Sequence, residues 1–432
     1  MNVYDSRLVS ESLKLSGFEE VNTPEEADVI LSNTCSVRQK AEERGVKFLR
    51  DYKKQGKITV MLGCVAQQHR RDQVLPGVDL AFGTRSYILL PQYIMGYLNG
   101  NAPENRILGE DFGLLELTDT PLKRRATWIQ EYVNIMQGCD NFCSYCIVPF
   151  TRGREISRPS EHILKELINL QKQGVVEVTL LGQNVNSYFD GKLQFYQLLD
   201  LLDKETEFLR IRFTTSHPRD LTYKVLRVIA DSTRITDWIH LPLQAGSTRI
   251  LKKMRRGYTK EEYIEIANMI REVLPEATIT TDIMVGFPGE TDEDFEDTLD
   301  VVRKVKFDHA FTFIYSPRPG TRAAKLKDDT SNEVKGKRLR ILIEEVNRIA
   351  HIQRTRMISK FYDFLVEGES RKDKSLSAGR NRGFIKGVIL GNYPPGTYLI
   401  GKVIDVKGLA PIVQPVKIID KFEIYNELTL SV

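Results

Sequence analysis

The hydrophobic and polar positions of this chain alternate between two spacings, which together predict an α/β protein. Apolar residues at helical spacing predict a helix in 6–17, and short apolar runs predict buried strands at 27–32 and 58–63. The alternation continues to residue 320. Strands are expected at 133–138, 176–182, 209–216, 238–243, 278–286 and 310–316, and helices at 160–173, 195–204, 221–230, 260–273 and 292–305. Ser160 is expected to be the N-cap of the first of these helices.

Six strands that alternate with helices indicate a parallel sheet with right-handed crossovers, and six such units form a partial (β/α)6 barrel. Active sites in barrels of this kind lie at the carboxyl ends of the strands. Amides, hydroxyls and glycines follow the predicted strands, as in Leu180-Leu-Gly-Gln-Asn-Val-Asn and Phe213-Thr-Thr-Ser-His-Pro. Each of these residue types is also common in turns, but their recurrence at one barrel mouth favours a ligand site.

The last part of the chain has a different pattern. A long amphipathic helix is expected at 332–358, followed by short glycine-containing strands at 362–366, 383–390, 397–406 and 416–419. Regularly spaced short strands predict a small β-barrel. The expected organisation is therefore an N-terminal α/β domain at 1–100, a linker at 101–124, a barrel core at 125–355 and a small β-barrel at 358–422.

Composition narrows the class of protein. The chain has 432 residues, of which 41% are hydrophobic and 28% charged, as in ordinary globular proteins. Its net charge of +4 permits a nucleic-acid partner without requiring one. The sequence contains no apolar run long enough to span a membrane, and its start has no secretory pattern. We therefore expect a cytoplasmic protein with reduced cysteines and no membrane partner.

The chemistry is expected at 137–158, where three and two residues separate Cys139, Cys143 and Cys146. A loop with this spacing can bind three irons of a 4Fe–4S cluster and leave the fourth iron open for a small molecule. A structural zinc site would need a fourth ligand, and none follows closely. The odd number of cysteines in a long chain disfavours a disulfide scaffold. The spacing thus favours an iron–sulfur site over three structural cysteines.

This loop resembles the signature loop of the radical S-adenosylmethionine (SAM) superfamily. The resemblance implies that Cys139, Cys143 and Cys146 are metal ligands and catalytic residues, that the open iron binds SAM, and that the cluster reduces SAM to a 5′-deoxyadenosyl radical. It also implies that strand-end residues bind SAM. The expected contacts are Gln183, Asn184, Thr214, Ser216, Gln244, Asp282 and Gly286. His217 and His240 also lie at strand ends, but the sequence assigns neither a catalytic role.

Cys35 and Cys64 each follow a predicted strand, and on spacing alone two ordinary buried cysteines are the favoured explanation. Asn33-Thr-Cys-Ser-Val-Arg and Gly63-Cys-Val-Ala-Gln-Gln, however, resemble the N-terminal domain of the methylthiotransferase family. The resemblance implies three cysteines that hold a second, auxiliary 4Fe–4S cluster, of which Cys35 and Cys64 are two. The third is expected in a Gly-Cys-Gln-Met-Asn stretch, just before Met1, so we expect the N-terminus to be truncated.

The segment Phe361-Tyr-Asp-Phe-Leu-Val-Glu-Gly-Glu-Ser-Arg-Lys372 resembles the TRAM domain, an OB-like module that binds RNA in related enzymes. The RNA contacts expected from this resemblance and from the arginines after the cysteine loop are Arg152, Arg154, Arg371, Lys372 and Arg380. The arginines after the cysteine loop could equally form salt bridges with Glu155 and Glu161. The small barrel could equally serve stability or docking.

The order of the three domains resembles the methylthiotransferases over essentially the whole chain. Segments such as Gly182-Gln-Asn-Val-Asn-Ser-Tyr188 resemble the subfamily that modifies isopentenylated adenosine beside the tRNA anticodon. This implies a methylthio group added to C2 of N6-isopentenyladenosine, with the sulfur held at the auxiliary cluster and the methyl group provided by a second SAM. The implied partners are tRNA through its anticodon loop, SAM, and an electron donor such as flavodoxin or ferredoxin. We expect a monomer.

Two other functions stay open at this point. One is the subfamily that modifies an aspartate of a ribosomal protein, in which the C-terminal domain would engage protein rather than RNA. The other is an RNA-binding iron–sulfur protein that cannot complete sulfur insertion because one auxiliary cysteine is missing. A salt-dependent affinity for tRNA would argue against the ribosomal-protein modifier, because counterion release dominates binding to nucleic acids.

Overall fold

The structure is a computed structural model of the chain, and it describes residues 1–36, 39–68, 76–101, 106–107 and 129–419. The chain forms two compact units. The first comprises Met1–Lys123, Met136–Ile156 and Arg318–Thr321, and the second comprises Arg124–Ile135, Ser157–Pro317 and Arg322–Val432. The predicted linker at 101–124 lies almost entirely outside the described residues. No helix in the described parts of the chain is both long and apolar enough to cross a membrane.

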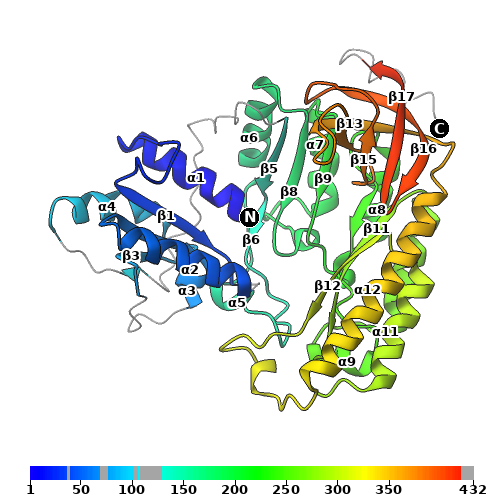
Figure 1. Cartoon of the computed structure of the whole chain (residues 1–432), viewed down its shortest axis with the longest axis horizontal. Helices are drawn as coiled ribbons and strands as arrows, with labels where there is room; N and C mark the ends of the chain where they lie inside the picture. Colours follow the sequence, from blue (N-terminus) through cyan, green and yellow to red (C-terminus); the bar gives the residue numbers. More distant parts are fainter. Residues whose placement is uncertain (37–38, 69–75, 102–105, 108–128, 420–432) are drawn as a thin grey trace. The chain divides into compact units, whose positions relative to one another are not determined.

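The first unit is built on a parallel sheet with the strand order β1-β2-β3-β4. Helices α1 and α2 lie on opposite sides of β1 (Figure 1). Its elements are α1 (Asn2–Leu15), β1 (Val29–Thr34), α2 (Gln39–Lys53), β2 (Ile58–Gly63), α3 (Cys64–Gln68), β3 (Leu80–Phe82), η1 (Tyr87–Leu89), α4 (Leu90–Leu98), β4 (Arg106–Ile107), β6 (Met136–Gln137) and α5 (Val148–Thr151). Successive side chains of β2 point to opposite faces of the sheet and belong to two different hydrophobic clusters. Val60 and Leu62 join the core with residues of α1 and α4, whereas Met61 joins the core that includes Leu49 of α2.

The second unit contains six parallel strands, in two sheets of order β5-β8-β9 and β10-β11-β12. The strands are β5 (Gln130–Asn134), β8 (Glu177–Leu181), β9 (Arg210–Phe213), β10 (Trp238–His240), β11 (Thr278–Val285) and β12 (His309–Ile314). An isolated parallel bridge between Ile211 and Ile235 connects the two sheets. The partial (β/α)6 barrel expected from the hydrophobic pattern is therefore confirmed.

Helices separate most of these strands, as predicted. They are α6 (Ser160–Lys172), α7 (Phe195–Glu205), α8 (Tyr223–Asp231), α9 (Thr248–Met254), α10 (Lys260–Val273) and α11 (Asp292–Val305), with the short helices η2 (Val185–Ser187), η3 (Pro218–Asp220) and η4 (Ala323–Lys325). The long helix α12 (Asn332–Thr355) follows the last strand. Its buried residues Leu342, Val346 and Ile349 lie on one stripe, so the predicted amphipathic helix is confirmed.

Several predicted boundaries were wrong, for local reasons. The expected first strand splits into β5 and β6, which pairs with β7 (Ile156–Ser157). Strand β9 ends early, at Phe213, and Thr215 has a left-handed φ of 73°. Strand β10 ends two residues before Pro242, which has no N–H to donate. Ser160 is the first residue of α6 rather than its N-cap, and its N–H donates to Asp190 at 2.8 Å.

Five strands close into a barrel at the end of the second unit, in the order β13-β14-β15-β17-β16. They are β13 (Phe361–Glu369), β14 (Ser377–Arg380), β15 (Lys386–Ile389), β16 (Tyr398–Lys407) and β17 (Ala410–Ile419). Phe364, Leu399, Val403 and Val413 fill the interior. The predicted small β-barrel is confirmed, although β14 and most of β17 were not anticipated.

The loop between β14 and β15 of the small barrel packs against strands β9 and β10 of the core. Phe384 of this loop stacks on Trp238 of β10, with ring centroids 4.1 Å apart and planes at 16°. Arg212 of β9 is fully buried and donates to the carbonyls of Asn381 and Arg382, at 2.9 and 2.7 Å. Arg210 donates to Asp363 of β13 at 2.6 Å. The small barrel is thus joined to the core by aromatic stacking and buried charge.

Candidate functional site

The loop with Cys139, Cys143 and Cys146 is a tight structure within the first unit. Gly138 has a φ of 84°, and a Cβ there would come within 2.1 Å of the Arg154 carbonyl, so only glycine fits. The Asn141 amide donates to the Cys139 sulfur at 3.5 Å. Burial raises the pKa of the Cys139 thiol, although the hydrogen bonds from Asn141 oppose this shift. The Cys143 and Glu155 charges also raise this pKa, so Cys139 and Cys143 are close enough to interact.

Cys35 and Cys64 lie side by side at the carboxyl edge of the N-terminal sheet. They directly follow β1 and β2, whose last residues Thr34 and Gly63 are partners in the parallel register. Gly63 has a φ of 93°, and a Cβ there would come within 2.5 Å of the Thr34 carbonyl. Glycine is therefore required where the chain turns from β2 into α3, and this turn keeps Cys64 beside Cys35.

Buried polar atoms without hydrogen-bond partners among the described residues occur on the segments beside these two cysteines. They are Asn33 Oδ1, Ser36 Oγ, Ser86 Oγ, Tyr87 Oη and Arg152 Nη1. Most of them are donors, and buried donors are rarely left unpaired in a finished fold. The cysteine thiolates and the sulfides of an iron–sulfur cluster are acceptors. These orphaned donors therefore fit a cluster bound at Cys35 and Cys64.

In the described parts of the chain, the five cysteines are free thiols, and His, Cys, Asp and Glu side chains form no group of three that could hold a single metal ion. The preference for an iron–sulfur site over a zinc site stays a prediction from the cysteine spacing.

Arg152 was expected to contact RNA, but the structure gives it another role. Its side chain is 3% exposed and forms an ion pair with Asp5 at 2.7 Å, so it offers no surface to a nucleic acid. Arg154 remains exposed, with an ion pair to Asp140 at 3.1 Å and its guanidinium 5.4 Å from the Phe142 ring centre. Arg158 is also buried, in an ion pair with Glu166 at 2.8 Å. Arg152 and Arg158 thus form buried ion pairs, but not with the Glu155 and Glu161 that the sequence offered as partners.

In the second unit, the loops after β8 and β9 are bonded to each other at the carboxyl ends of the strands. The amide of Asn184 donates to Asp220 at 2.6 Å and accepts from the His217 N–H at 3.1 Å. Asn184 is only 2% exposed. Asn184 thus holds the two loops together, and its expected contact with SAM stays a prediction.

These two loops also carry buried polar groups that have no partner among the described residues. They are the Ser216 hydroxyl, both ring nitrogens of His217 and the side-chain amide of Asn186. Ser216 was an expected SAM contact, whereas Asn186 was missed because an asparagine after a strand reads equally well as a turn residue. Buried groups of this kind fit a polar ligand. Gln183 and Thr214 are half-buried beside them, and Thr214 lines a cavity of about 520 Å³.

A chain of hydrogen bonds crosses the strands β10 and β11. The indole N–H of Trp238 donates to Thr280 at 2.9 Å. The Thr280 hydroxyl lies 3.0 Å from Nδ1 of His240, whose Nε2 lies 3.3 Å from Asp282. An indole N–H can only donate, so the Thr280 hydroxyl accepts from Trp238 and is free to donate its own hydrogen bond to Nδ1 of His240. Nε2 of His240 then carries the hydrogen and donates to Asp282. Asp282, an expected SAM contact, is thereby oriented. Gln244 is half-buried with a left-handed φ of 70°.

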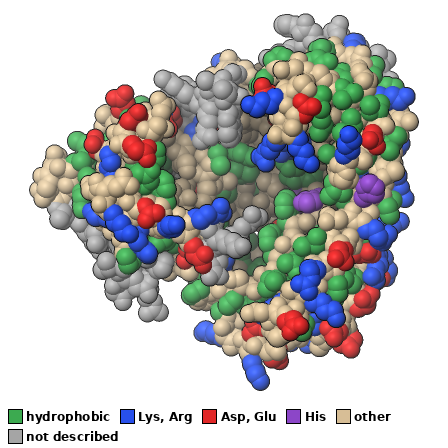
Figure 2. Space-filling model, in the orientation of Figure 1, with side chains coloured by type: hydrophobic (Ala, Val, Ile, Leu, Met, Phe, Trp, Pro, Cys, Tyr) green, Lys and Arg blue, Asp and Glu red, His purple; other side chains and the backbone are tan. Residues whose placement is uncertain are grey.

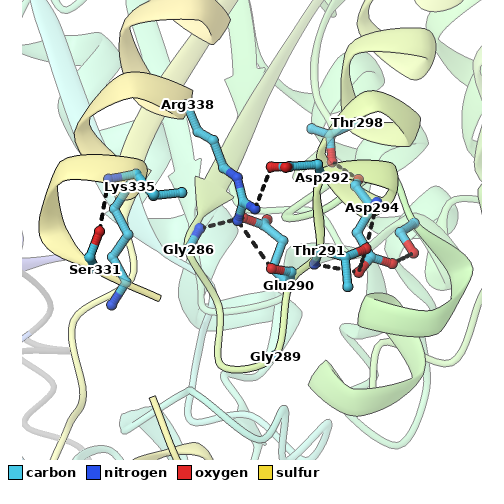
Figure 3. A network of polar contacts seen from close by, with 12 residues as sticks. Gly286, Gly289, Glu290, Thr291, Asp292, Asp294, Thr298, Ser331, Lys335 and Arg338 are labelled. Carbon is cyan, nitrogen blue, oxygen red and sulfur yellow. Dashed lines mark hydrogen bonds and ion pairs between the residues drawn. The ribbon is translucent and has the colours of Figure 1, made fainter. Parts of the chain in front are cut away.

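Gly286, the last expected SAM contact, lies in a turn fixed by the network in Figure 3. Its N–H donates to the Glu290 carboxylate at 2.7 Å, and Arg338 of α12 donates to the same carboxylate at 2.8 Å. Burial raises the pKa of Glu290, although the Gly286 N–H and Arg338 oppose this shift. Because Gly286 has a φ of 73° and packs against Lys335, it shapes the turn that ends β11.

The expected RNA-binding residues of the small barrel differ in exposure. Arg371 and Lys372 are exposed on the turn between β13 and β14. Arg380 is half-buried, forms an ion pair with Glu367, and its guanidinium lies 4.6 Å from the Phe384 ring centre. On the face shown in Figure 2, Lys and Arg side chains lie over the small barrel with acidic side chains between them. Arg371 and Lys372 are the better placed to meet phosphate.

Comparisons with known proteins agree with this geometry. The family model for the radical SAM superfamily matches residues 133–302, and the model described as "Uncharacterized protein family UPF0004" matches residues 1–83. A tRNA-2-methylthio-N(6)-dimethylallyladenosine synthase of Pelotomaculum thermopropionicum is 43% identical over 418 residues, which cover 94% of this chain and 92% of the relative. One from Carboxydothermus hydrogenoformans is 44% identical over 421 residues, which cover 94% of each.

The chain belongs to the tRNA-2-methylthio-N(6)-dimethylallyladenosine synthase family. It is thus a radical SAM enzyme of the methylthiotransferase type, and the family resemblance found in its motifs is confirmed. The fold of this synthase family member is also similar to a radical SAM methyltransferase, TsrM of Kitasatospora setae, whose structure holds cobalamin and a [4Fe-4S] cluster. That likeness has a TM-score of 0.59 at 14% identity and covers 74% of each chain, so it supports the fold alone.

Proposed function

We propose that this chain adds a methylthio group to C2 of N6-isopentenyladenosine beside the anticodon of tRNA. The observation that carries the proposal is the identity of 43% and 44% with two tRNA-2-methylthio-N(6)-dimethylallyladenosine synthases over almost the whole chain. The cysteine pattern supports it, because the chain offers one set of three cysteines and a second pair at a separate sheet edge. Neither the ribosomal-protein modifier nor an incomplete enzyme is favoured by a comparable observation.

Cys139, Cys143 and Cys146 would hold the 4Fe–4S cluster that binds SAM, and Cys35 and Cys64 would supply two ligands of the auxiliary cluster. When bound, the first cluster supplies the electron that cleaves SAM to the 5′-deoxyadenosyl radical. The chain's own residues position the reactants and exclude water. The SAM contacts that we propose are Gln183, Asn184, Thr214, Ser216, Gln244, Asp282 and Gly286, with Asn186 added from its unpartnered amide.

The RNA partner would be the anticodon loop, whose unstacked bases can leave the stack and enter a protein pocket. Arg154, Arg371, Lys372 and Arg380 would contact its phosphates, which positions the RNA without reading its sequence. We further propose a cytoplasmic monomer that receives electrons from a flavodoxin or ferredoxin.

The test is anaerobic reconstitution followed by assay on tRNA that carries N6-isopentenyladenosine. We expect about eight irons per chain, and about four in the variant Cys139→Ala/Cys143→Ala/Cys146→Ala, as for two 4Fe–4S clusters. Nucleoside analysis should find the methylthio product only with the parent protein. A Cys35→Ala/Cys64→Ala variant should still cleave SAM but form no product. Product on a ribosomal protein, or SAM cleavage without product in the parent, would overturn the proposal.

A further inference from the structure

One arginine connects the two cysteine-bearing parts of the first unit. Arg152 directly follows the short helix α5, six residues after Cys146. Its guanidinium donates to two α1 side chains, Asp5 at 2.7 Å and Asn2 at 3.2 Å. The Thr84 hydroxyl donates to the Thr151 carbonyl at 2.7 Å, beside it. The segment after the cysteine loop is therefore fastened to the N-terminal domain at adjacent residues.

Arg152 lies near Cys64, because helix α3, which begins at Cys64, packs against helix α5, which ends just before Arg152. Burial would lower the pKa of Arg152, but Asp5, then Cys64 and Tyr87, raise it above its ordinary value. The pKa of buried Tyr87 is raised by burial and by Asp5, whereas Arg152 lowers it. These charged and titratable groups thus share one small volume at the end of β1 and β2.

One nitrogen of the Arg152 guanidinium has no hydrogen-bond partner among the described residues. Nη2 donates to Asp5 and Asn2, but Nη1 is buried without a partner among the described residues. Leaving a charged donor unpaired in a buried site is costly, so a nearby acceptor is expected. The acceptors that the proposed function places here are the thiolates and sulfides of a cluster on Cys35 and Cys64. Asp5 and the cluster would then share the positive charge of Arg152.

We propose that Arg152 is a positioning residue that extends from the SAM-cluster loop to the auxiliary cluster and stabilises its reduced form. Reduction adds an electron to a cluster, and net charge and hydrogen bonds to sulfur set its potential. A buried cation beside the auxiliary cluster therefore raises the reduction potential of that cluster, and the Asp5 carboxylate lowers it. The inference rests on the proposed function, because it requires a cluster on Cys35 and Cys64.

The test measures the auxiliary cluster by itself, in full-length chains carrying Cys139→Ala/Cys143→Ala/Cys146→Ala. The midpoint potential is followed by electron paramagnetic resonance during a redox titration, and iron is counted in each sample. Arg152→Gln removes the cation, Asp5→Asn removes its counter-charge, and Arg152→Lys retains the cation. Lys53→Gln is the matched control, since it breaks a 2.6 Å ion pair with Asp79 at the far end of α2.

We expect a lower potential in Arg152→Gln and a higher one in Asp5→Asn, with Arg152→Lys close to the parent and Lys53→Gln unchanged. Opposite shifts cannot come from general loosening of the fold. If Arg152→Gln loses its iron, the midpoint potential of Asp5→Asn by itself tests the inference. Unchanged potentials in chains that keep their iron would overturn only this inference. No iron in the starting chain would overturn the auxiliary cluster of the proposed function as well.

Discussion

At the scale of single residues, burial rather than sequence motif separates functional from structural side chains. Arg152 and Arg154 belong to one short motif, yet Arg152 is buried against Asp5 while Arg154 is exposed. Asn184 and Asn186 are two residues apart, yet the first is hydrogen-bonded to Asp220 and His217 and the second has a side-chain amide without a partner among the described residues. Neighbours in a loop point in different directions, so their roles differ.

His217 leads to a prediction about acid stability. Burial, and then Arg256 and Arg219, lower its pKa to about 2 from the ordinary 6.5, so the folded protein holds it neutral. The unfolded chain binds a proton at this residue below about pH 6.5. Stability is therefore lost as the pH falls below 6.5, by up to about 1.4 kcal/mol per pH unit. The loss from this residue would end only near the folded pKa.

Thermal unfolding of the reconstituted parent and of His217→Leu should show this difference between pH 7 and pH 5. We expect the parent to lose more stability over this range, because the variant has no group to titrate at this position. The other five of the six histidines are common to both proteins, so the comparison isolates His217. Equal losses in the two proteins would mean that His217 accepts a proton in the fold.

At the scale of elements, the contact between the small barrel and the core depends on one loop. Phe384 has a left-handed φ of 64°, and its ring is held between Trp238, Arg212 and Arg380. A non-glycine residue in this conformation is uncommon and needs support from its surroundings. Aromatic and cationic contacts provide that support here. The loop therefore holds the small barrel against strands β9 and β10.

Replacing Phe384 with leucine should loosen this contact. The stacked pair contributes about 0.5–1.5 kcal/mol beyond the area it buries, so a small drop in thermal stability is expected. The sharper readout is tryptophan fluorescence, which should shift to longer wavelength as water reaches Trp238. Phe361→Leu is the control, because Phe361 is 57% exposed on the same barrel. An unchanged emission in Phe384→Leu would show that the stack does not shield Trp238.

At the scale of the whole molecule, some positive charges are buried between the small barrel and the core, and others are exposed on the small barrel. Arg210 and Arg212 are buried among Glu177, Asp363 and backbone carbonyls, so they join the small barrel to the core. Arg371 and Lys372 are exposed on the small barrel. The net charge of +4 is a sum over the chain, so it does not distinguish the buried arginines from the exposed ones. The small barrel can thus serve both of the roles that the sequence left open.

The double variant Arg371→Gln/Lys372→Gln should separate the two roles. Its affinity for tRNA should fall, and its salt dependence should become shallower by roughly 1 in log–log slope for each phosphate that the variant no longer neutralises. Thermal stability should stay within about 0.5 kcal/mol of the parent, as for other surface changes. An affinity for tRNA and a salt dependence unchanged from the parent would contradict a phosphate-contacting role for Arg371 and Lys372.

The sequence by itself determined the α/β class, the partial barrel, the small β-barrel and the cysteine pattern. These features follow from periodicity and spacing, which are properties of short stretches. The bounds predicted for helices α10 and α11 from the apolar pattern are those of the structure, in which capping boxes at Thr259 and Thr291 begin them. The family, too, could be inferred from local motifs, since its chemistry needs those residues at those intervals.

Only the tertiary structure decided which of these residues are buried, paired or left without a partner. It assigned the loop 139–146 to the same compact unit as Cys35 and Cys64, whereas the strand pattern assigned it to the core. It paired Arg152 with Asp5, which is 147 residues away, and inserted Phe384 against Trp238. Such contacts depend on the free energy of packing distant segments together, and no pattern within either segment encodes the partner.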